Sequence, residues 1–289
     1  LRAIQASRPG GFDSIPRVIA FEEYRGRPIL VETALVGQPM GRPAVRHDLS
    51  GCCNAVTGWL ADVHKSTRGP APLSPPVERG IARRWFERLV ERPLRYFEDV
   101  FPLSTEEKRL LERTWELVTP LGEMSLPLVF EHGDLCHPNI FLLKHGGAGV
   151  VDWELAEPDG LPTYDLFFFL TYATFAWHRA HSAGDYLSAF RLAFFGHEAW
   201  ARPYVETYAG QLRLPSDALT PLFVLCWARY VVSLLIRLNG AEHPPGRLGS
   251  ETVAWLRANR YYTLWQHTVT HVNELDWGDL PRTRDGVKR

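Results

Sequence analysis

Lysine is the scarcest charged residue in this chain, because only four of its 32 basic side chains are lysines. The 33 acidic residues nearly balance the basic ones and leave a formal net charge of −1. A chain without an excess of positive charge lacks the electrostatic footprint of a nucleic-acid-binding or anionic-membrane-binding protein. We therefore expect neither a nucleic acid nor a membrane as a partner.

Cysteine is also scarce, and its spacing argues against the usual structural zinc site. None of the four cysteines forms a C-x-x-C pair, the spacing on which such sites are commonly built. Cys52 and Cys53 are adjacent within a helical pattern, and we interpret them as small core residues rather than a redox pair. A reducing, cytoplasmic location fits this cysteine usage.

Long apolar runs are missing as well. The stretch at 166–177 is well short of the ~20 residues that a membrane-spanning helix needs. The stretch at 221–236 is interrupted by Arg229. We interpret both stretches as buried helices.

What the chain contains is a globular composition, with 45% hydrophobic and 22% charged residues. Runs of β-branched and aromatic residues predict strands within 15–35 and 128–152. Apolar residues at helical spacing predict helices over 48–65, 81–99 and 104–118, and the last begins with a capping box, Ser104 to Glu107. From residue 183 onward the pattern is helical, with breaks at 202–203, 215, 243–246 and 281. The sequence therefore predicts an α+β protein with a small β-containing front and a mostly helical body.

The segment that carries chemistry lies between residues 128 and 154. Its predicted strands are at 128–130, 140–143 and 149–151. The last two form a tight hairpin, which places Asn139 beside Asp152, with Asp134 on the loop just before them. Two oxygen ligands beside a free carboxylate suit a hard cation such as Mg²⁺.

The order of these residues resembles the kinase pattern H-R-D-L-x-x-x-N followed by an Asp that holds metal. Here the pattern reads His132-Gly133-Asp134-Leu-Cys-His-Pro-Asn139, with Gly133 in place of the Arg. The variant H-G-D-x-x-x-x-N followed by V-D-W-E resembles the aminoglycoside phosphotransferase and choline kinase superfamily of small-molecule kinases. This resemblance implies a protein kinase-like fold with a mostly helical large lobe and a truncated small β lobe.

Other segments are similar to the same superfamily. They are 30–39, which looks like the hinge, 59–64, which looks like the first large-lobe helix, and 162–166, which looks like the segment after the metal-binding Asp. The similarity covers roughly residues 12–180. It implies that residues 1–36 are a remnant of the nucleotide-binding small lobe and hinge. Residues 37–289 are then the large lobe, with the catalytic segment at 128–154.

The resemblance also implies residue roles. Asp134 accepts or orients the proton of the substrate hydroxyl, and His132 braces the loop rather than reacting. Asn139 and Asp152 bind Mg²⁺. Glu154 matches the second acid of the D-x-E pair and supports metal or substrate.

The hinge-like segment predicts which residues contact the nucleotide. By resemblance, backbone groups at Glu32 and Ala34 meet the adenine of ATP, which is the co-substrate. The expected acceptor is a small molecule with a hydroxyl group, such as an aminoglycoside, choline or a sugar. The oligomeric state stays open.

Two other interpretations of the polar and aromatic residues remain. His132, Cys136 and His137 are alternative ligands of a zinc-type metal cluster. Six tryptophans are alternative components of a cage for a quaternary ammonium group. They are Trp177, Trp200, Trp227, Trp255, Trp265 and Trp277. Asp165 reads as a buried structural carboxylate rather than a catalyst.

The phosphate-binding parts of a kinase are not found before the hinge. No G-x-G-x-x-G motif occurs there, and no lysine precedes Lys65, although kinases use both for the phosphates. We therefore expect a fragment that alone binds ATP poorly and transfers no phosphate. A start assigned too late, or a degenerate protein, would explain the same observation. Two hypotheses follow, an ATP- and Mg²⁺-dependent small-molecule kinase and a catalytically silent binding module with the same large lobe.

Overall fold

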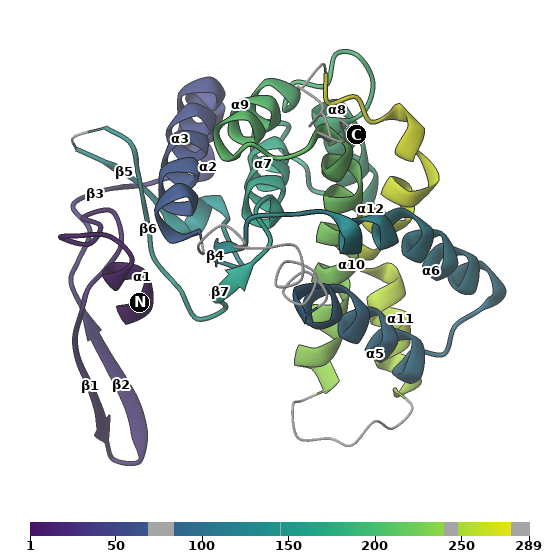
Figure 1. Cartoon of the computed structure of the whole chain (residues 1–289), viewed down its shortest axis with the longest axis horizontal. Coiled ribbons are helices and arrows are strands. Elements are labelled where there is room, and N and C mark those ends of the chain that lie inside the picture. The colour runs from purple at the N-terminus through teal and green to yellow at the C-terminus, as the bar shows by residue number, and fades with distance from the viewer. Residues whose placement is uncertain (69–83, 145, 240–247, 279–289) are drawn as a thin grey trace, which may run out of the picture. The chain divides into compact units, whose positions relative to one another are not determined.

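The computed structural model describes residues 1–68, 84–144, 146–239 and 248–278 (Figure 1). The chain forms two compact units. Unit 1 comprises Leu1–Gly69, Pro127–Ala180 and Pro203–Leu212, and unit 2 comprises Pro70–Leu126, His181–Arg202 and Arg213–Arg289. Among the described residues every strand belongs to unit 1, while unit 2 is built of helices. The expected boundary between residues 36 and 37 falls inside unit 1 and stays a prediction.

Unit 1 begins its β structure with an exposed hairpin. Strands β1 (Val18–Tyr24) and β2 (Arg27–Glu32) pair antiparallel, with Tyr24 opposite Arg27. Arg25 and Gly26 form the turn with φ angles of 54° and 74°, and two left-handed residues are the signature of the tight hairpin turn that matches strand twist. The antiparallel pair predicted within 15–35 is confirmed.

A second group of short strands carries the segment with the polar motif. Strands β3 (Gly37–Pro39), β5 (Ile140–Leu143) and β6 (Ala148–Val150) form an antiparallel sheet in the order β3-β5-β6. Strand β4 (Val129–Glu131) pairs antiparallel with β7 (Glu157–Gly160). The β5 strand has the predicted bounds, and β4 and β6 are each displaced by one residue from the prediction.

The helices of unit 1 are α1 (Arg2–Ala6), α2 (Arg42–His47), α3 (Leu49–Thr67), α7 (Tyr164–Trp177) and α9 (Arg202–Leu212). Helix α3 starts where it was predicted to start, because the Asp48 carboxylate caps it by accepting the Gly51 N–H at 2.7 Å. Cys52 and Cys53 are buried in α3, so their interpretation as core residues is confirmed. Helix α7 is buried along nearly its whole length, as expected for the stretch 166–177.

The first residues of the chain are held in unit 1 by the hydrogen bonds of one side chain and by a small apolar cluster. The Gln5 amide donates to the carbonyl oxygens of Phe12 at 3.0 Å and Ile15 at 2.6 Å, and its oxygen accepts the Phe12 N–H at 2.7 Å. Ile4, Phe12 and Ile15 pack with Val63 of α3 and Phe130 of β4. The N-terminal segment therefore lies against the elements that lead into the polar motif.

Unit 2 contains η1 (Glu87–Glu91), α5 (Arg92–Val100), α6 (Thr105–Val118), η2 (Thr119–Glu123), α8 (Ala183–Phe194), α10 (Ser216–Asn239), α11 (Ser250–Ala258), α12 (Arg260–Thr270) and η4 (Val272–Glu274). The predicted capping box of α6 is present, with the Ser104 N–H donating to Glu107 Oε2 at 2.6 Å and the Glu107 N–H donating to Ser104 Oγ at 3.2 Å. The predicted breaks at 243–246 and 281 lie outside the described residues.

Helix α10 is the core helix of unit 2. Helices α5, α6 and α12 pack against it, and Phe223 and Trp227 are fully buried. By length and composition alone, residues 216–238 could cross a membrane, but 67% of the apolar window is buried inside the protein. The prediction of a buried helix at 221–236 is confirmed, and the helix continues through Arg229 and Pro221.

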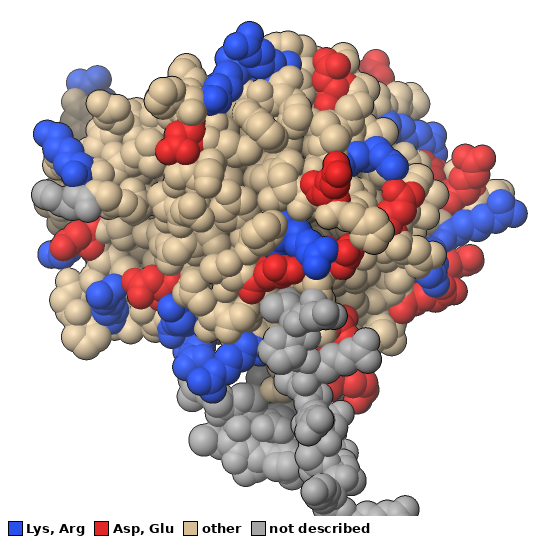
Figure 2. Space-filling view, turned by 90° about the horizontal axis from the view of Figure 1, so that it is seen from above, with Lys and Arg blue, Asp and Glu red and all other residues tan. Residues whose placement is uncertain are grey.

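Charged side chains of both signs are mixed on the surface. Figure 2 shows Lys and Arg interspersed with Asp and Glu over the face that it displays. This mixture agrees with the near balance of acidic and basic residues in the sequence.

Candidate active site

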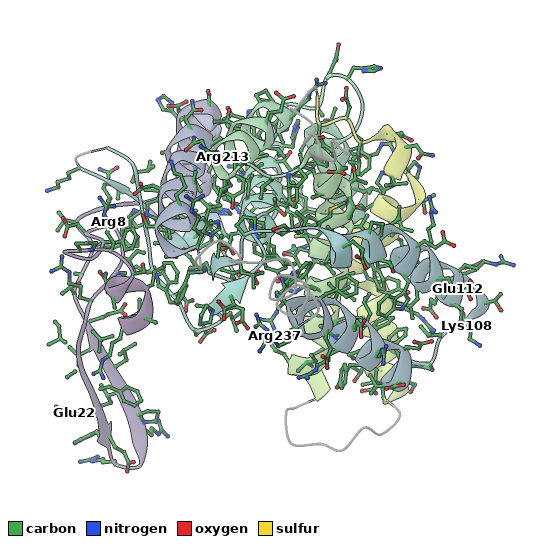
Figure 3. The ribbon with its side chains drawn as sticks, viewed as in Figure 1. Arg8, Glu22, Lys108, Glu112, Arg213 and Arg237 are labelled. Carbon is green, nitrogen blue, oxygen red and sulfur yellow. The ribbon has the colours of Figure 1, made fainter. Side chains whose placement is uncertain are left out.

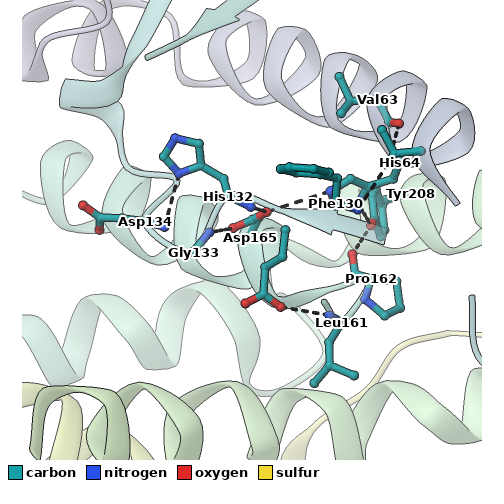
Figure 4. A network of polar contacts seen from close by, with 12 residues as sticks. Val63, His64, Phe130, His132, Gly133, Asp134, Leu161, Pro162, Asp165 and Tyr208 are labelled. Atoms are coloured by element: carbon teal, nitrogen blue, oxygen red, sulfur yellow. Dashed lines mark hydrogen bonds and ion pairs between the residues drawn. The ribbon is translucent and has the colours of Figure 1, made fainter. Parts of the chain in front are cut away.

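A single buried carboxylate holds the start of the polar loop, residues 132–139. Asp165, the second residue of α7, accepts the backbone N–H of His132 at 2.6 Å and that of Gly133 at 2.9 Å (Figure 4). Its side chain is fully buried, so the predicted burial of Asp165 is confirmed. The two residues that follow β4 are thereby tied to α7.

The His132 ring connects the polar loop to the end of the β5–β6 hairpin. Its Nδ1 accepts the backbone N–H of Asp134 at 3.2 Å, so the ring proton is on Nε2, which donates to the Val151 carbonyl at 2.9 Å. Burial lowers the pKa of His132 to about 4, although the Val151 carbonyl and the Asp152 charge act in the opposite direction. A neutral ring with both nitrogens bonded to backbone suits the bracing role predicted for His132.

The structure explains why glycine stands where the kinase pattern has arginine. Gly133 has a φ of +84°, a left-handed conformation that favours glycine. A Cβ atom at this position would lie 2.4 Å from the backbone oxygen of Leu155. The close approach of residue 155 to the loop therefore leaves no room for a side chain at 133.

Asp134 and Asn139 are in direct contact at the two ends of the turn. The Asn139 amide nitrogen donates to the Asp134 backbone oxygen at 3.0 Å and to its carboxylate Oδ2 at 3.3 Å. An amide that donates in this direction keeps its oxygen as the atom able to bind a cation. Both side chains are partly buried.

The hairpin closes as the sequence predicted. Ile140 pairs with Val150, and the Val151 N–H donates to the Asn139 carbonyl at 3.0 Å, so Asn139 and Asp152 lie at the same end of the sheet. Asp152 has a φ of +66° and an exposed side chain. Such a conformation is uncommon for a residue with a side chain and occurs preferentially at functional sites.

Next to Asp152 lies an open cleft of about 760 Å³ within unit 1. Its lining residues are Leu1, Arg2, Ala3, Val18, Phe21, Leu30, Glu32, Asp152, Trp153 and Glu154. Apolar side chains from β1, β2 and Trp153 form one part of the lining, and three carboxylates with Arg2 form the polar part. The structure therefore brings Glu32, Asp152 and Glu154 to one cleft, whereas Ala34, Asp134 and Asn139 do not line it.

The remaining polar residues of the loop do not form a zinc-type cluster. Burial raises the pKa of the Cys136 thiol to about 12, and burial followed by the charge of Arg42 lowers the pKa of His137 to about 4. In the part of the chain that the structure describes, no three His, Cys, Asp or Glu side chains are grouped to hold a metal ion. The zinc interpretation of His132, Cys136 and His137 has no geometric support.

Five of the six tryptophans named above do not form a cage. Trp227, Trp265 and Trp277 are buried core residues of unit 2, where Trp227 packs against Phe190 and Tyr261. Trp177 and Trp255 are exposed by 41% and 47%. A quaternary ammonium cage needs several ring faces around one open space, and these rings face other rings or solvent.

Three residues in this region were given no role from the sequence. Arg2 lines the cleft from α1, but a lone arginine far from the motif carries no pattern. Tyr208 of α9 contacts His64 of α3, and both are fully buried. His64 ends the segment 59–64, but nothing in the sequence pairs it with a residue 144 positions later.

Comparisons with known proteins give the family of this chain and solved structures with a similar fold. The model of the Phosphotransferase enzyme family (APH) matches residues 2–204. Among solved structures, a putative aminoglycoside phosphotransferase from Ralstonia eutropha JMP134 is 14% identical with a TM-score of 0.53, covering 93% of this chain and 82% of the other. A thermostable mutant of aminoglycoside phosphotransferase APH(4)-Ia, in its apo form, is 14% identical with a TM-score of 0.50, covering 88% of this chain and 77% of the other. No curated protein matches the chain.

The family match covers more than half of the chain and includes the whole polar motif. The chain belongs to the phosphotransferase enzyme family. Its fold is the α+β, protein kinase-like fold of that family, as the sequence predicted. The site residues named from the sequence stay predictions, and the geometry above is what supports them.

Proposed function

We propose that this chain is the catalytic part of a cytoplasmic, ATP-dependent small-molecule kinase. It transfers the γ-phosphoryl group of ATP to a hydroxyl group of an aminoglycoside-, choline- or sugar-like acceptor. The observation that carries the proposal is the placement of Asp134, Asn139 and Asp152 at one end of the β5–β6 hairpin. Membership of the phosphotransferase enzyme family supports phosphoryl transfer as the reaction.

Asp134 is the acid–base residue of this proposal. It orients the acceptor hydroxyl and takes its proton while the hydroxyl oxygen forms a bond to the γ-phosphorus. The bond between that phosphorus and its bridging oxygen breaks, and ADP leaves with the electron pair. Asn139 fixes the orientation of the Asp134 carboxylate by donating to its Oδ2 at 3.3 Å.

Asn139 and Asp152 are the residues that hold Mg²⁺, with Glu154 beside Asp152 supporting metal or substrate. Their donor set fits, because Mg²⁺ binds through oxygen and takes few protein ligands. When bound, the ion neutralises negative charge on the phosphoryl group. The left-handed conformation of Asp152 presents its carboxylate at the cleft rather than continuing the strand.

The nucleotide lies in the cleft beside Asp152. Its apolar lining at Val18, Phe21 and Leu30 suits a base, and the backbone at Glu32 and Ala34 meets the adenine edge. Support for Glu32 comes from its position in the cleft lining, which Ala34 does not share. Arg2 brings a positive charge to the same lining, and an arginine pairs favourably with phosphate groups.

The test is the substitution Asp152→Asn in the full-length gene product. Asparagine tolerates the left-handed conformation, so the exchange removes the charge and keeps the backbone. We expect Mg²⁺-dependent ATP binding, measured by calorimetry over a range of Mg²⁺ concentrations, to weaken at least about tenfold. Asp159→Asn, at an exposed acid on β7, is the control and should bind as the parent does. Identical metal dependence in Asp152→Asn and parent would remove Asp152 from the metal site.

Turnover separates the kinase from a silent binding module. ATP consumption is measured with aminoglycosides, choline, sugars and amino alcohols as acceptors. A kinase consumes ATP in step with one acceptor class, and that turnover disappears when Mg²⁺ is removed. Metal-dependent ATP binding without turnover on any acceptor would favour the binding module.

A further inference from the structure

A buried polar network links helix α9 to the polar loop within unit 1 (Figure 4). The Tyr208 hydroxyl donates to the Pro162 carbonyl and lies 2.5 Å from Nδ1 of His64. Tyr208, His64 and Asp165 are all fully buried. Three polar side chains without access to water are costly unless they bond to one another or to backbone, so their arrangement has to be specific.

Proton counting gives the direction of each hydrogen bond. The Pro162 carbonyl can only accept, so the single proton of the Tyr208 hydroxyl goes to it. His64 then donates from Nδ1 to the Tyr208 oxygen. Burial lowers the pKa of His64 to about 3, so the ring is neutral. Its Nε2, which has no hydrogen-bond partner among the described residues, faces Asp165 Oδ2 at 3.9 Å.

The Tyr208 hydroxyl stays protonated in this environment. Burial raises its pKa well above the usual value, and the charges of Asp165 and Glu131 raise it further. It therefore remains a donor to the Pro162 carbonyl at neutral pH.

Two hydrogen bonds hold the segment just before Asp165, one at Leu161 and one at Pro162. On one side, Glu131 at the end of β4 accepts the Leu161 N–H at 2.8 Å. On the other side, Tyr208 holds the Pro162 carbonyl. Asp165 follows three residues later and binds the first two amides of the polar loop. A shift of residues 161–162 would therefore move Asp165 and, with it, the start of the loop that ends at Asn139.

We propose that Tyr208 is a positioning residue: its hydroxyl holds Pro162 and the His64 ring so that Asp165 keeps His132 and Gly133, and therefore Asp134, in place. The inference deepens the proposed function and rests on it for its catalytic consequence. Tyr208 does not touch substrate or metal. The geometric part of the proposal concerns the loop alone and can be measured without a substrate.

The experiment compares Tyr208→Phe with Tyr204→Phe in the full-length gene product. Tyr204 lies one turn earlier on α9, and its hydroxyl is 3.4 Å from Ser50 Oγ at an exposed contact, which makes it a matched control. Amide hydrogen exchange is measured by NMR for every resolved residue, together with thermal unfolding. We expect Tyr208→Phe to accelerate exchange at His132 and Gly133 about tenfold more than at other buried amides, because the buried hydrogen bond to the Pro162 carbonyl is lost. Tyr204→Phe should leave both amides unchanged.

A purely structural role gives a different result. Exchange would then rise uniformly across unit 1 in proportion to the lost stability, and that outcome would overturn the proposal. Unchanged exchange at His132 and Gly133 would overturn it as well. Should Tyr208→Phe fail to fold, difluorotyrosine at position 208 keeps the ring and hydroxyl while making a stronger donor. The exchange rates of the His132 and Gly133 amides should then change more than those of other buried amides. Unchanged rates at these two amides would contradict the inference.

Steady-state kinetics tests whether the loss of the Tyr208 hydroxyl also affects catalysis. With ATP, Mg²⁺ and whichever acceptor supports turnover, Tyr208→Phe should lower kcat about tenfold while KM for ATP stays within about twofold, because the loop and not the cleft is displaced. A rise in KM with unchanged kcat would place Tyr208 in nucleotide binding instead and overturn the positioning role. If no acceptor supports turnover but the two amides respond as expected, the proposed function fails and the positioning of the loop by Tyr208 stands.

Discussion

Unit 1 contains two antiparallel hairpins that have opposite environments. The hairpin β1–β2 is exposed, with Phe21 at 66% and Ile19 at 65% of their accessible surface. In β5–β6, by contrast, Ile140 and Val150 are fully buried. Strand β3 pairs with the free edge of β5, and the Val150 N–H donates to the Ser14 carbonyl at 2.9 Å. The two hairpins thus differ in what packs against them rather than in strand-forming residues.

This difference shows which part of unit 1 can hold reactive side chains in a fixed position. A loop that must hold a carboxylate to within a fraction of an ångström needs neighbours on every side. The end of β5–β6 has them, through Asp165, His132 and Trp153, whose ring lies 4.7 Å from that of His132. The β1–β2 hairpin instead presents side chains such as Glu22 outward (Figure 3).

The largest expected effect comes from removing the Asp134 carboxylate of the polar loop, which leads into the buried hairpin. Asp134→Ala should lower kcat by about 10²–10⁴, the usual contribution of a positioned acid–base group. Glu22→Ala, which removes an exposed acid from the other hairpin, is the control and should stay within about twofold of the parent. Steady-state turnover with ATP and an accepted acceptor measures both. Near-normal turnover in Asp134→Ala would remove this residue from the mechanism.

Acid should destabilise the polar loop next to the buried hairpin through protonation of His132. Burial lowers its pKa to about 4, below the ordinary value of about 6.5. Between these values the unfolded chain binds a proton that the folded chain does not, so stability is complete above about pH 6.5 and is lost as the pH falls toward 4. The full effect is about 3 kcal/mol.

The measurement is the free energy of unfolding by denaturant at pH 7 and pH 5 for the parent and for His132→Gln. Other buried histidines with lowered pKa values, such as His64, contribute equally to both proteins. We expect the parent to lose about 2 kcal/mol more than the variant over this interval. Equal losses would show that His132 does not titrate as its burial predicts. The β1–β2 hairpin contains no histidine and adds nothing to this dependence.

A pair of glycines compares the polar loop with the turn of the exposed hairpin. Gly133 and Gly26 have φ angles of +84° and +74°, so alanine at either position is strained by about 1–2 kcal/mol. At Gly26 an added Cβ meets nothing within 4 Å, whereas at Gly133 it would lie 2.4 Å from the Leu155 backbone oxygen. We therefore expect Gly133→Ala to be the more destabilising of the two in denaturant unfolding. Equal losses would mean that residue 155 yields easily and that the loop is less constrained than its contacts indicate.

The smallest effect on stability should come from the exposed hairpin itself. Phe21→Ser removes a side chain that is 66% exposed, so the free energy of unfolding should change by less than about 0.5 kcal/mol. Self-association, measured by light scattering, should decrease because exposed apolar surface is reduced. A loss of roughly 3 kcal/mol or more, typical of a buried phenylalanine, would show that something covers this hairpin in solution.

Sequence patterns predicted helices and strands well where the residues that specify them are close together in the sequence. The β-branched and aromatic runs and the turn residues of β1–β2, the helical spacing of α3 and the capping box of α6 each involve residues a few positions apart. The β5–β6 hairpin was predicted for the same reason, and it brought Asn139 alongside Asp152. Contacts between distant segments had no such signal. Examples are the pairing of β4 with β7 and the hold of Gln5 on Phe12 and Ile15.

By itself, the sequence determined the class of this protein and the residue types at its site, because the H-G-D and Asn spacing and the following V-D-W-E are short-range patterns. Only the tertiary structure decided that Gly133 has no room for a side chain, that Arg2 shares a cleft with Asp152, and that Tyr208 reaches the loop through Pro162. The physical reason is that burial and close approach depend on segments far apart in the chain. Periodicity indicates which face of an element is apolar, but packing alone determines what meets that face.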